Sequence, residues 1–103
     1  MMIARWRIDA RFGHKDDVVK SLKQWGDQFG SKIGWSGDKF RLMTGSIGIA
    51  ESAIISEVEI ENLDELSAAF EKLGTLDGHA AWSKELEPHV VSGTNNWEIY
   101  RIV

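Results

Sequence analysis

The order in which two hydrophobic spacings alternate along the chain is the feature that most constrains its fold. Residues 2–10 alternate apolar and polar side chains, which is the period-two pattern of a strand with one buried face. We expect further strands in residues 39–44, 53–60 and 96–102. Apolar residues recur at the three- and four-residue spacing of an amphipathic helix in residues 15–30 and 62–74. The order strand, helix, strand, strand, helix, strand follows.

Local signals mark where several of these elements begin and end. Asn62, followed three residues later by a glutamate, is the arrangement of a capping box at a helix N-terminus. A shorter helix over residues 78–87 is expected to stop at Pro88. Residues 31–38 carry two glycines around Trp35 and are expected to form a loop.

This order of elements predicts an α+β fold. Two strand–helix–strand halves with antiparallel pairing give the ferredoxin-like βαββαβ sandwich, a four-stranded antiparallel sheet with the helices on one face. Its first strand lies between the third and the fourth. With 103 residues and no internal linker, the chain is expected to form a single domain, residues 1–103. The uncovered face of the sheet is either solvated or packed against a second copy about a two-fold axis.

Charge is distributed unevenly between the two halves of the chain. Residues 1–50 hold nine Lys/Arg and five Asp/Glu, whereas residues 51–103 hold three and eleven. The expected strand order places Arg5 and Arg7 across from Glu57 and Glu59, where opposite charges stabilise a pair of strands by about 0.2–1 kcal/mol each. Since the net charge is −4 and no basic run exists, we expect no nucleic-acid partner.

The composition also excludes several kinds of chemistry. The chain has no cysteine, which rules out disulfides, thiolate metal sites and a cysteine nucleophile. It carries no Gly-x-Ser-x-Gly motif. No segment is apolar enough to span a membrane, and the N-terminal residues reach charged positions too early for a signal peptide. We expect a cytoplasmic protein with no membrane partner.

Five tryptophans are more than a core of this size needs. Trp6, Trp25 and Trp97 fall on inward faces of their elements and are expected in the core. Neither Trp35, in the glycine-flanked loop, nor Trp82, on the short helix, is explained by periodicity. We expect these two to line a pocket or a subunit contact.

The histidines offer candidates for proton transfer. His79 lies three residues before Trp82, so the two can share one helix face, and an imidazole titrates near neutrality. The alternative is a histidine that only caps local backbone. His79 and His89 are separated by ten residues that include a proline, which is not a metal-ligand spacing, so no metal site is expected. His14, at a strand–helix turn, is expected to be exposed.

Residues 77–90 and the terminal segment Trp97-Glu98-Ile99-Tyr100-Arg101 resemble the dimeric α/β-barrel superfamily, in particular its NIPSNAP-like and antibiotic-biosynthesis-monooxygenase-like small proteins. The resemblance implies a homodimer formed through the sheet faces and a ligand cleft between helices and sheet. The monooxygenase branch has an asparagine on the first strand, where this chain presents Ala4, Trp6 and Ile8 inward.

These observations together predict a small-molecule site in that cleft. We expect Trp6, Trp35, Trp82 and His89 to bind an apolar or aromatic compound, with His79 as the candidate catalytic residue and no cofactor. Two alternatives remain open at this point. One is a cofactor-independent monooxygenase, and the other is a non-enzymatic dimerisation or stress-response module.

Overall fold

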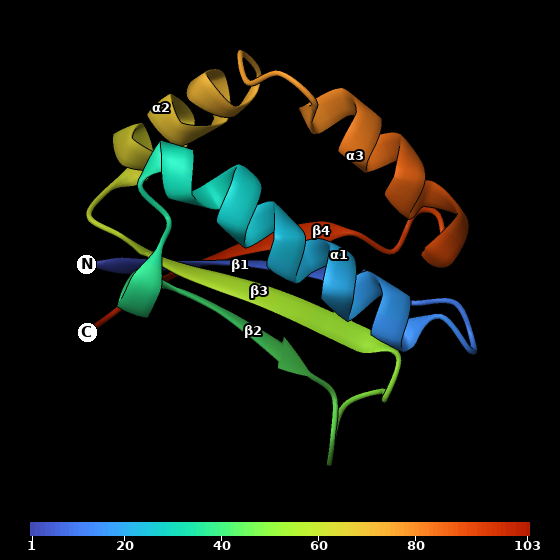
Figure 1. Ribbon diagram of the computed structural model, residues 1–103. Helices are drawn as coiled ribbons and strands as arrows, with labels where there is room; N and C mark the ends of the chain where they lie inside the picture. The colour runs from blue at the N-terminus through green and yellow to red at the C-terminus, as the bar shows by residue number, and fades with distance from the viewer.

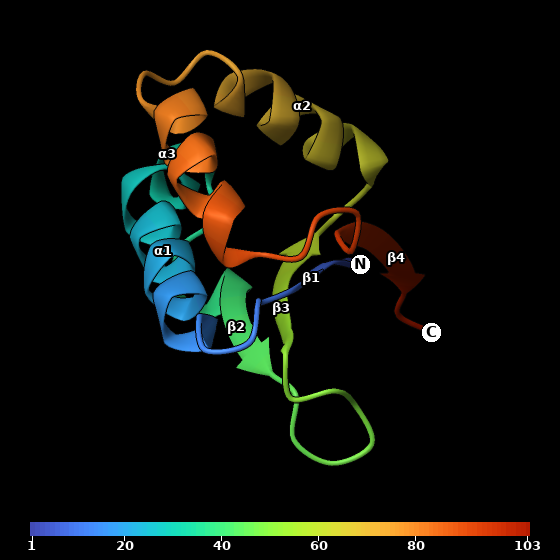
Figure 2. The same ribbon diagram turned by 90° about the vertical axis from the view of Figure 1, so that its right-hand side faces the viewer.

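The computed structural model describes residues 1–103 and has one four-stranded sheet with all of its helices on one face (Figures 1 and 2). The strands are β1 (Met2–Asp9), β2 (Phe40–Thr44), β3 (Ala53–Ile60) and β4 (Asn96–Arg101). The helices are α1 (Lys15–Gln28), α2 (Leu63–Leu73) and α3 (His79–Leu86), with 3₁₀ turns η1 (Gly30–Ile33), η2 (Gly37–Lys39) and η3 (Glu87–His89). None of these helices is long and apolar enough to cross a membrane.

The strand order is β2-β3-β1-β4, and every neighbouring pair is antiparallel. The first strand therefore lies between the third and the fourth, which confirms the ferredoxin-like α+β fold expected from the pattern of the sequence. The alternation of side chains in β1 fixes the register of its pairing, because a shift of one residue would turn the apolar side of β1 toward solvent. Ala4 and Ile8 of β1 are buried beneath the helices.

The predicted helix ends are largely confirmed. The Asn62 side chain caps α2 by accepting a hydrogen bond from the Glu65 N–H at 2.9 Å. The Glu65 carboxylate accepts from the Glu61 N–H at 2.6 Å, one residue further back than in a standard capping box. Pro88 does not end the helical path at once. It lies near the start of η3, where a residue without an N–H is tolerated.

Residues 31–38 are more ordered than the predicted loop, because η1 and η2 occupy most of them. The backbone N–H of Trp35 donates to the Gly30 carbonyl oxygen at 2.8 Å, which folds the segment back on itself. A Cβ atom at Gly30 would lie 3.1 Å from both the Trp25 ring and the Trp35 carbonyl oxygen, so glycine permits this close approach. Trp35 is consequently buried in the core of its own chain.

Charge pairing on the uncovered face follows the antiparallel register. Arg5 lies opposite Glu57, as expected, but Arg7 lies opposite Ile55 and not Glu59. The expected Arg7–Glu59 pair is wrong because partners in an antiparallel pair advance in opposite directions. Arg7 instead contacts Asp9 on its own strand, with 3.4 Å between the charged atoms.

Glu57 is the centre of this uncovered face. Only 4% of its side chain is exposed, and its two carboxylate oxygens accept from Arg5 Nη2 at 2.7 Å and from Arg41 Nε at 2.6 Å. Burial by itself raises the pKa of the Glu57 carboxyl, but the hydrogen bonds from the two arginines outweigh it and hold the pKa below its ordinary value. The Arg5 guanidinium also lies 5.1 Å from the centre of the Tyr100 ring. The buried charge of Glu57 is thus balanced within this face.

Candidate functional site

A cavity of about 270 Å³ lies between the sheet and the three helices, and all five tryptophans line it. Nine of its twelve lining residues are hydrophobic, and the three polar ones are Ser56, His79 and Ser83. Each layer of the fold contributes to the wall. The indoles come from β1, α1, the segment between η1 and η2, α3 and β4, in the order Trp6, Trp25, Trp35, Trp82 and Trp97.

Trp25 is the central ring of this wall. Its ring centre lies 6.0 Å from that of Trp35, 5.7 Å from that of Phe40 and 6.5 Å from that of Trp82. The ring pairs are tilted, which suits the charge distribution of aromatic rings better than a face-to-face stack. The helical spacing of α1 points Trp25 at the sheet together with Val18 and Leu22, so the wall is anchored in the core.

His79 is the polar group that this aromatic wall holds in place. The Trp25 indole N–H donates to His79 Nε2 at 2.9 Å, which leaves Nδ1 to carry the ring proton of the neutral imidazole. Phe29 lies edge-on to the ring with 5.1 Å between centres. Burial lowers the pKa of His79 below its ordinary value. At neutral pH the imidazole can therefore donate a hydrogen bond from Nδ1, while Nε2 is already engaged by Trp25.

This lowered pKa makes stability depend on pH. Below pH 6.5, the ordinary value, the unfolded chain binds a proton at His79 more readily than the folded chain does. We expect the free energy of unfolding to fall as the pH drops below 6.5 toward the folded-state pKa of His79. His79→Gln keeps an acceptor for Trp25 and cannot titrate, so its stability should decline less over the same range. Urea denaturation of both proteins at several pH values measures this, and parallel curves would contradict it.

Four of the five residues expected at a ligand site line the cavity, and they are Trp6, Trp35, Trp82 and His79. The Trp82 indole also donates to the Ser21 carbonyl oxygen at 3.0 Å, which ties α3 to α1. Trp97, expected in the core, is 41% exposed and forms part of the cavity wall instead. The alternation of side chains along a strand shows which residues face the helices. It does not show whether the space between those residues and the helices is filled.

His89 is the expected ligand-binding residue that the structure does not bring to the cavity. It lies in η3, and its Nδ1 atom is 3.1 Å from Nδ1 of His14, which precedes α1. Asp17 completes this second group, with Oδ2 at 3.2 Å from His14 Nδ1. The three-residue spacing of His14 and Asp17 at a helix start was the available signal. The approach of His89 to these two residues could not be predicted, because it depends on how the chain returns from α3 to the sheet.

No protein-family model and no curated protein matches the sequence. Solved structures do match in fold. A NIPSNAP family protein from Agrobacterium tumefaciens superposes with a TM-score of 0.78 at 20% identity, covering 100% of this chain and 94% of that one. A putative antibiotic biosynthesis monooxygenase from Nitrosomonas europaea gives 0.67 at 7% identity, covering 100% and 99%. SnoaB from Streptomyces nogalater, a cofactor-independent oxygenase, gives 0.67 at 10% identity, covering 98% and 91%. The resemblance seen in the sequence is thus confirmed as a shared fold.

Proposed function

We propose that this protein binds a small apolar or aromatic molecule in the tryptophan-lined cavity. The observation that carries the proposal is the convergence of all five indoles on one cavity that contains few polar groups. Ligand sites are typically apolar hollows with a small number of fixed polar groups. A chain of 103 residues that needed only a core would gain more by filling this space than by lining it.

The size of the cavity limits the ligand. An apolar cavity of about 150 Å³ accommodates benzene. At about 270 Å³, this cavity suits a compound with two fused rings. Phe70 and Trp97 are the most exposed lining residues, and their ring centres lie 5.3 Å apart. We infer that the ligand enters beside this pair, between α2 and β4.

The polar groups of the wall favour a ligand with one hydrogen-bonding group. His79 offers Nδ1–H as a donor, and the Ser56 and Ser83 hydroxyls can donate or accept. A single hydroxyl or carbonyl on an aromatic skeleton matches this set. His79 is also the one ordinarily titratable side chain among the lining residues, so any proton transfer in the cavity falls to it.

We also infer that the protein is a homodimer formed through the uncovered face of the sheet. Ile55 and Met43 lie side by side on this face, next to Glu57, which is ion-paired with Arg5 and Arg41. Apolar side chains beside paired charges suit a self-complementary interface about a two-fold axis. The resemblance to the dimeric α/β-barrel superfamily implies the same arrangement.

The oxygenase alternative draws on the structural neighbour from Streptomyces nogalater. None of the three asparagines of the chain, Asn62, Asn95 and Asn96, lines the cavity. The lining residues therefore support binding more directly than oxygenation. The remaining alternative, a non-enzymatic module, needs no ligand and predicts no binding at all.

Isothermal titration calorimetry with 2-naphthol as the ligand tests the proposed function. We expect saturable binding of one molecule per chain. Trp97→Ala removes one wall of the cavity entrance and should weaken binding at least tenfold. Phe12→Ala is the control, because Phe12 is a fully exposed aromatic residue outside the cavity. Absence of saturable binding, or equal affinity of both variants, would show that the cavity is not the site.

A further inference from the structure

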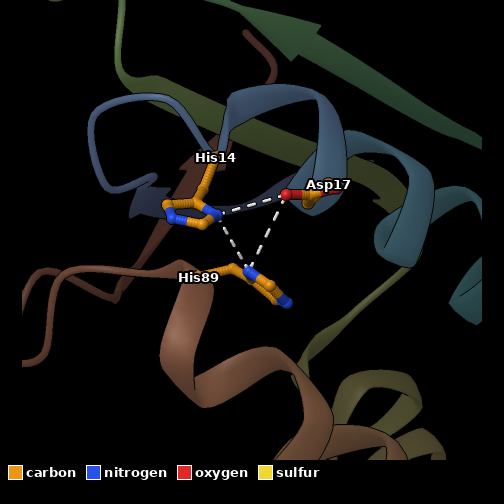
Figure 3. A group of neighbouring side chains, drawn as sticks. All are labelled: His14, Asp17 and His89. Atoms are coloured by element: carbon orange, nitrogen blue, oxygen red, sulfur yellow. Dashed lines mark hydrogen bonds and ion pairs between the residues drawn. The ribbon is translucent and has the colours of Figure 1, made fainter.

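His14, Asp17 and His89 form a second cluster, none of whose members lines the tryptophan-lined cavity. The three come from two places in the chain, the start of α1 and the turn after α3. His14 directly precedes α1, Asp17 lies in the first turn of α1, and His89 lies in η3. Figure 3 shows Nδ1 of each imidazole and one carboxylate oxygen of Asp17 facing one another at the corners of a triangle.

The edges of this triangle are close to the spacing of ligand atoms around a metal ion. Nδ1 of His14 lies 3.1 Å from Nδ1 of His89 and 3.2 Å from Oδ2 of Asp17, and the third edge is 3.8 Å. A tetrahedral Zn²⁺ ion with bonds of about 2.0–2.2 Å to nitrogen and oxygen holds its ligand atoms about 3.3–3.6 Å apart. The observed edges span this value, so an ion fits with side-chain shifts of a few tenths of an ångström.

Hydrogen bonding within the cluster leaves it incompletely satisfied. A proton on His14 Nδ1 can be donated to Asp17 or to His89, but a single proton does not make full hydrogen bonds to both. A proton on His89 Nδ1 can be donated to His14 Nδ1, but His14 Nδ1 then has no proton to donate to the Asp17 carboxylate. Three lone-pair atoms that converge in this way are satisfied together by one divalent cation.

The backbone around the cluster is held by contacts that do not involve these side chains. The Arg11 N–H donates to the His89 carbonyl oxygen at 2.9 Å, and Arg11 Nε donates to the Val90 carbonyl oxygen at 3.2 Å. Ala10 and Val90 form an antiparallel bridge, and both are buried. The turn before α1 and the turn after α3 are therefore fixed relative to each other, which keeps the backbone of His14 close to that of His89.

We propose that His14, Asp17 and His89 bind a divalent first-row transition-metal ion, with Zn²⁺ the ion that fits them best. Two imidazole nitrogens and one carboxylate oxygen form a ligand set for Zn²⁺, Co²⁺, Ni²⁺ or Cu²⁺, whereas Mg²⁺ and Ca²⁺ prefer sites made of oxygen alone. The side chains are 44%, 56% and 32% exposed in chain order. Solvent can thus supply the fourth ligand, as in zinc sites that keep an open position.

Calorimetric titration of the chelator-treated, tag-free chain with ZnCl₂ tests this site. We expect one Zn²⁺ per chain, with affinity at least 100-fold lower in His14→Ala and in His89→Ala and at least tenfold lower in Asp17→Asn. MgCl₂ should give no binding. His79→Ala is the matched control, because it removes the third histidine of the chain from the other site and should change zinc affinity less than twofold.

Two further measurements keep the outcome clear. Far-UV circular dichroism in chelator checks that each variant is folded, and His14→Gln replaces His14→Ala if the alanine variant is not. Co²⁺ added to the wild type should produce the visible absorption of a low-symmetry site with nitrogen ligands, and the His89→Ala variant should lack it. Failure of Zn²⁺ to saturate the wild-type chain, or undiminished binding in both histidine variants, would overturn the proposal.

Discussion

A Trp25→Ala variant is expected to lose about 3–5 kcal/mol in the free energy of unfolding, the range typical of large aromatic residues removed from a core. Trp25 is 9% exposed, contacts Trp35, Phe40 and Trp82, and donates to His79. Its removal would join a new void to the existing cavity and leave the His79 acceptor without its partner. Since small domains are stable by only about 5–15 kcal/mol, urea denaturation should show a large drop in midpoint.

Trp97→Ala is the matched control for this prediction. Trp97 lines the same cavity but lies on β4 with 41% of its surface exposed, so its loss should cost less than about 2 kcal/mol. Trp25→Phe, which keeps one aromatic ring but loses the indole N–H and part of the ring volume, should recover part of the stability lost in Trp25→Ala. If Trp97→Ala proved as damaging as Trp25→Ala, the edge of the sheet and not α1 would anchor the aromatic wall.

An Ile55→Glu variant is expected to convert the proposed homodimer into a monomer. Ile55 lies between Arg7 and Met43 on the uncovered face of the sheet, where the proposed interface is centred. A carboxylate added there would lie opposite Arg7, but in the dimer it would be removed from water close to its symmetry-related copy, which we expect to raise the dimer dissociation constant at least 100-fold. Size-exclusion chromatography with light scattering at micromolar concentration reports the change in mass.

Leu63→Glu is the control for the oligomeric state. Leu63 is exposed at the start of α2, on the helix side of the sheet, and a glutamate in the first turn of a helix is well tolerated. This variant should remain dimeric. A wild-type protein that elutes as a monomer, or an Ile55→Glu variant that stays dimeric, would be incompatible with an interface on this face.

The elements that bury one side, such as β1 and α1, could be predicted from the sequence. Burial of one side produces the alternation in the sequences of β1 and β3. It also produces the helical spacing of Val18, Leu22 and Trp25 in α1. Asn62 caps α2 as expected because capping depends only on residues close in sequence. Antiparallel register was the exception within the sheet, since Arg5 was paired correctly with Glu57 but Arg7 was not with Glu59.

Features that depend on distant parts of the chain were beyond the reach of periodicity. Trp35 is buried by η1 and η2, which are held by backbone hydrogen bonds that leave no hydrophobic repeat. His89 meets His14 although 75 positions separate them. The cavity itself arises because α2 and α3 leave a space above Trp6 and Ser56, and the sequence records only that these residues face inward.

The aromatic wall also has an optical consequence. Trp25 has neighbouring indoles at 6.0 Å and 6.5 Å, and Trp35 lies 6.4 Å from Trp97, so the ultraviolet transitions of these rings couple. Coupled indoles add paired bands of opposite sign to the far-ultraviolet circular dichroism spectrum. A helix content read from that spectrum alone would therefore be in error for this chain. The same bands would serve as an internal gauge of how the rings are arranged, without any attached dye.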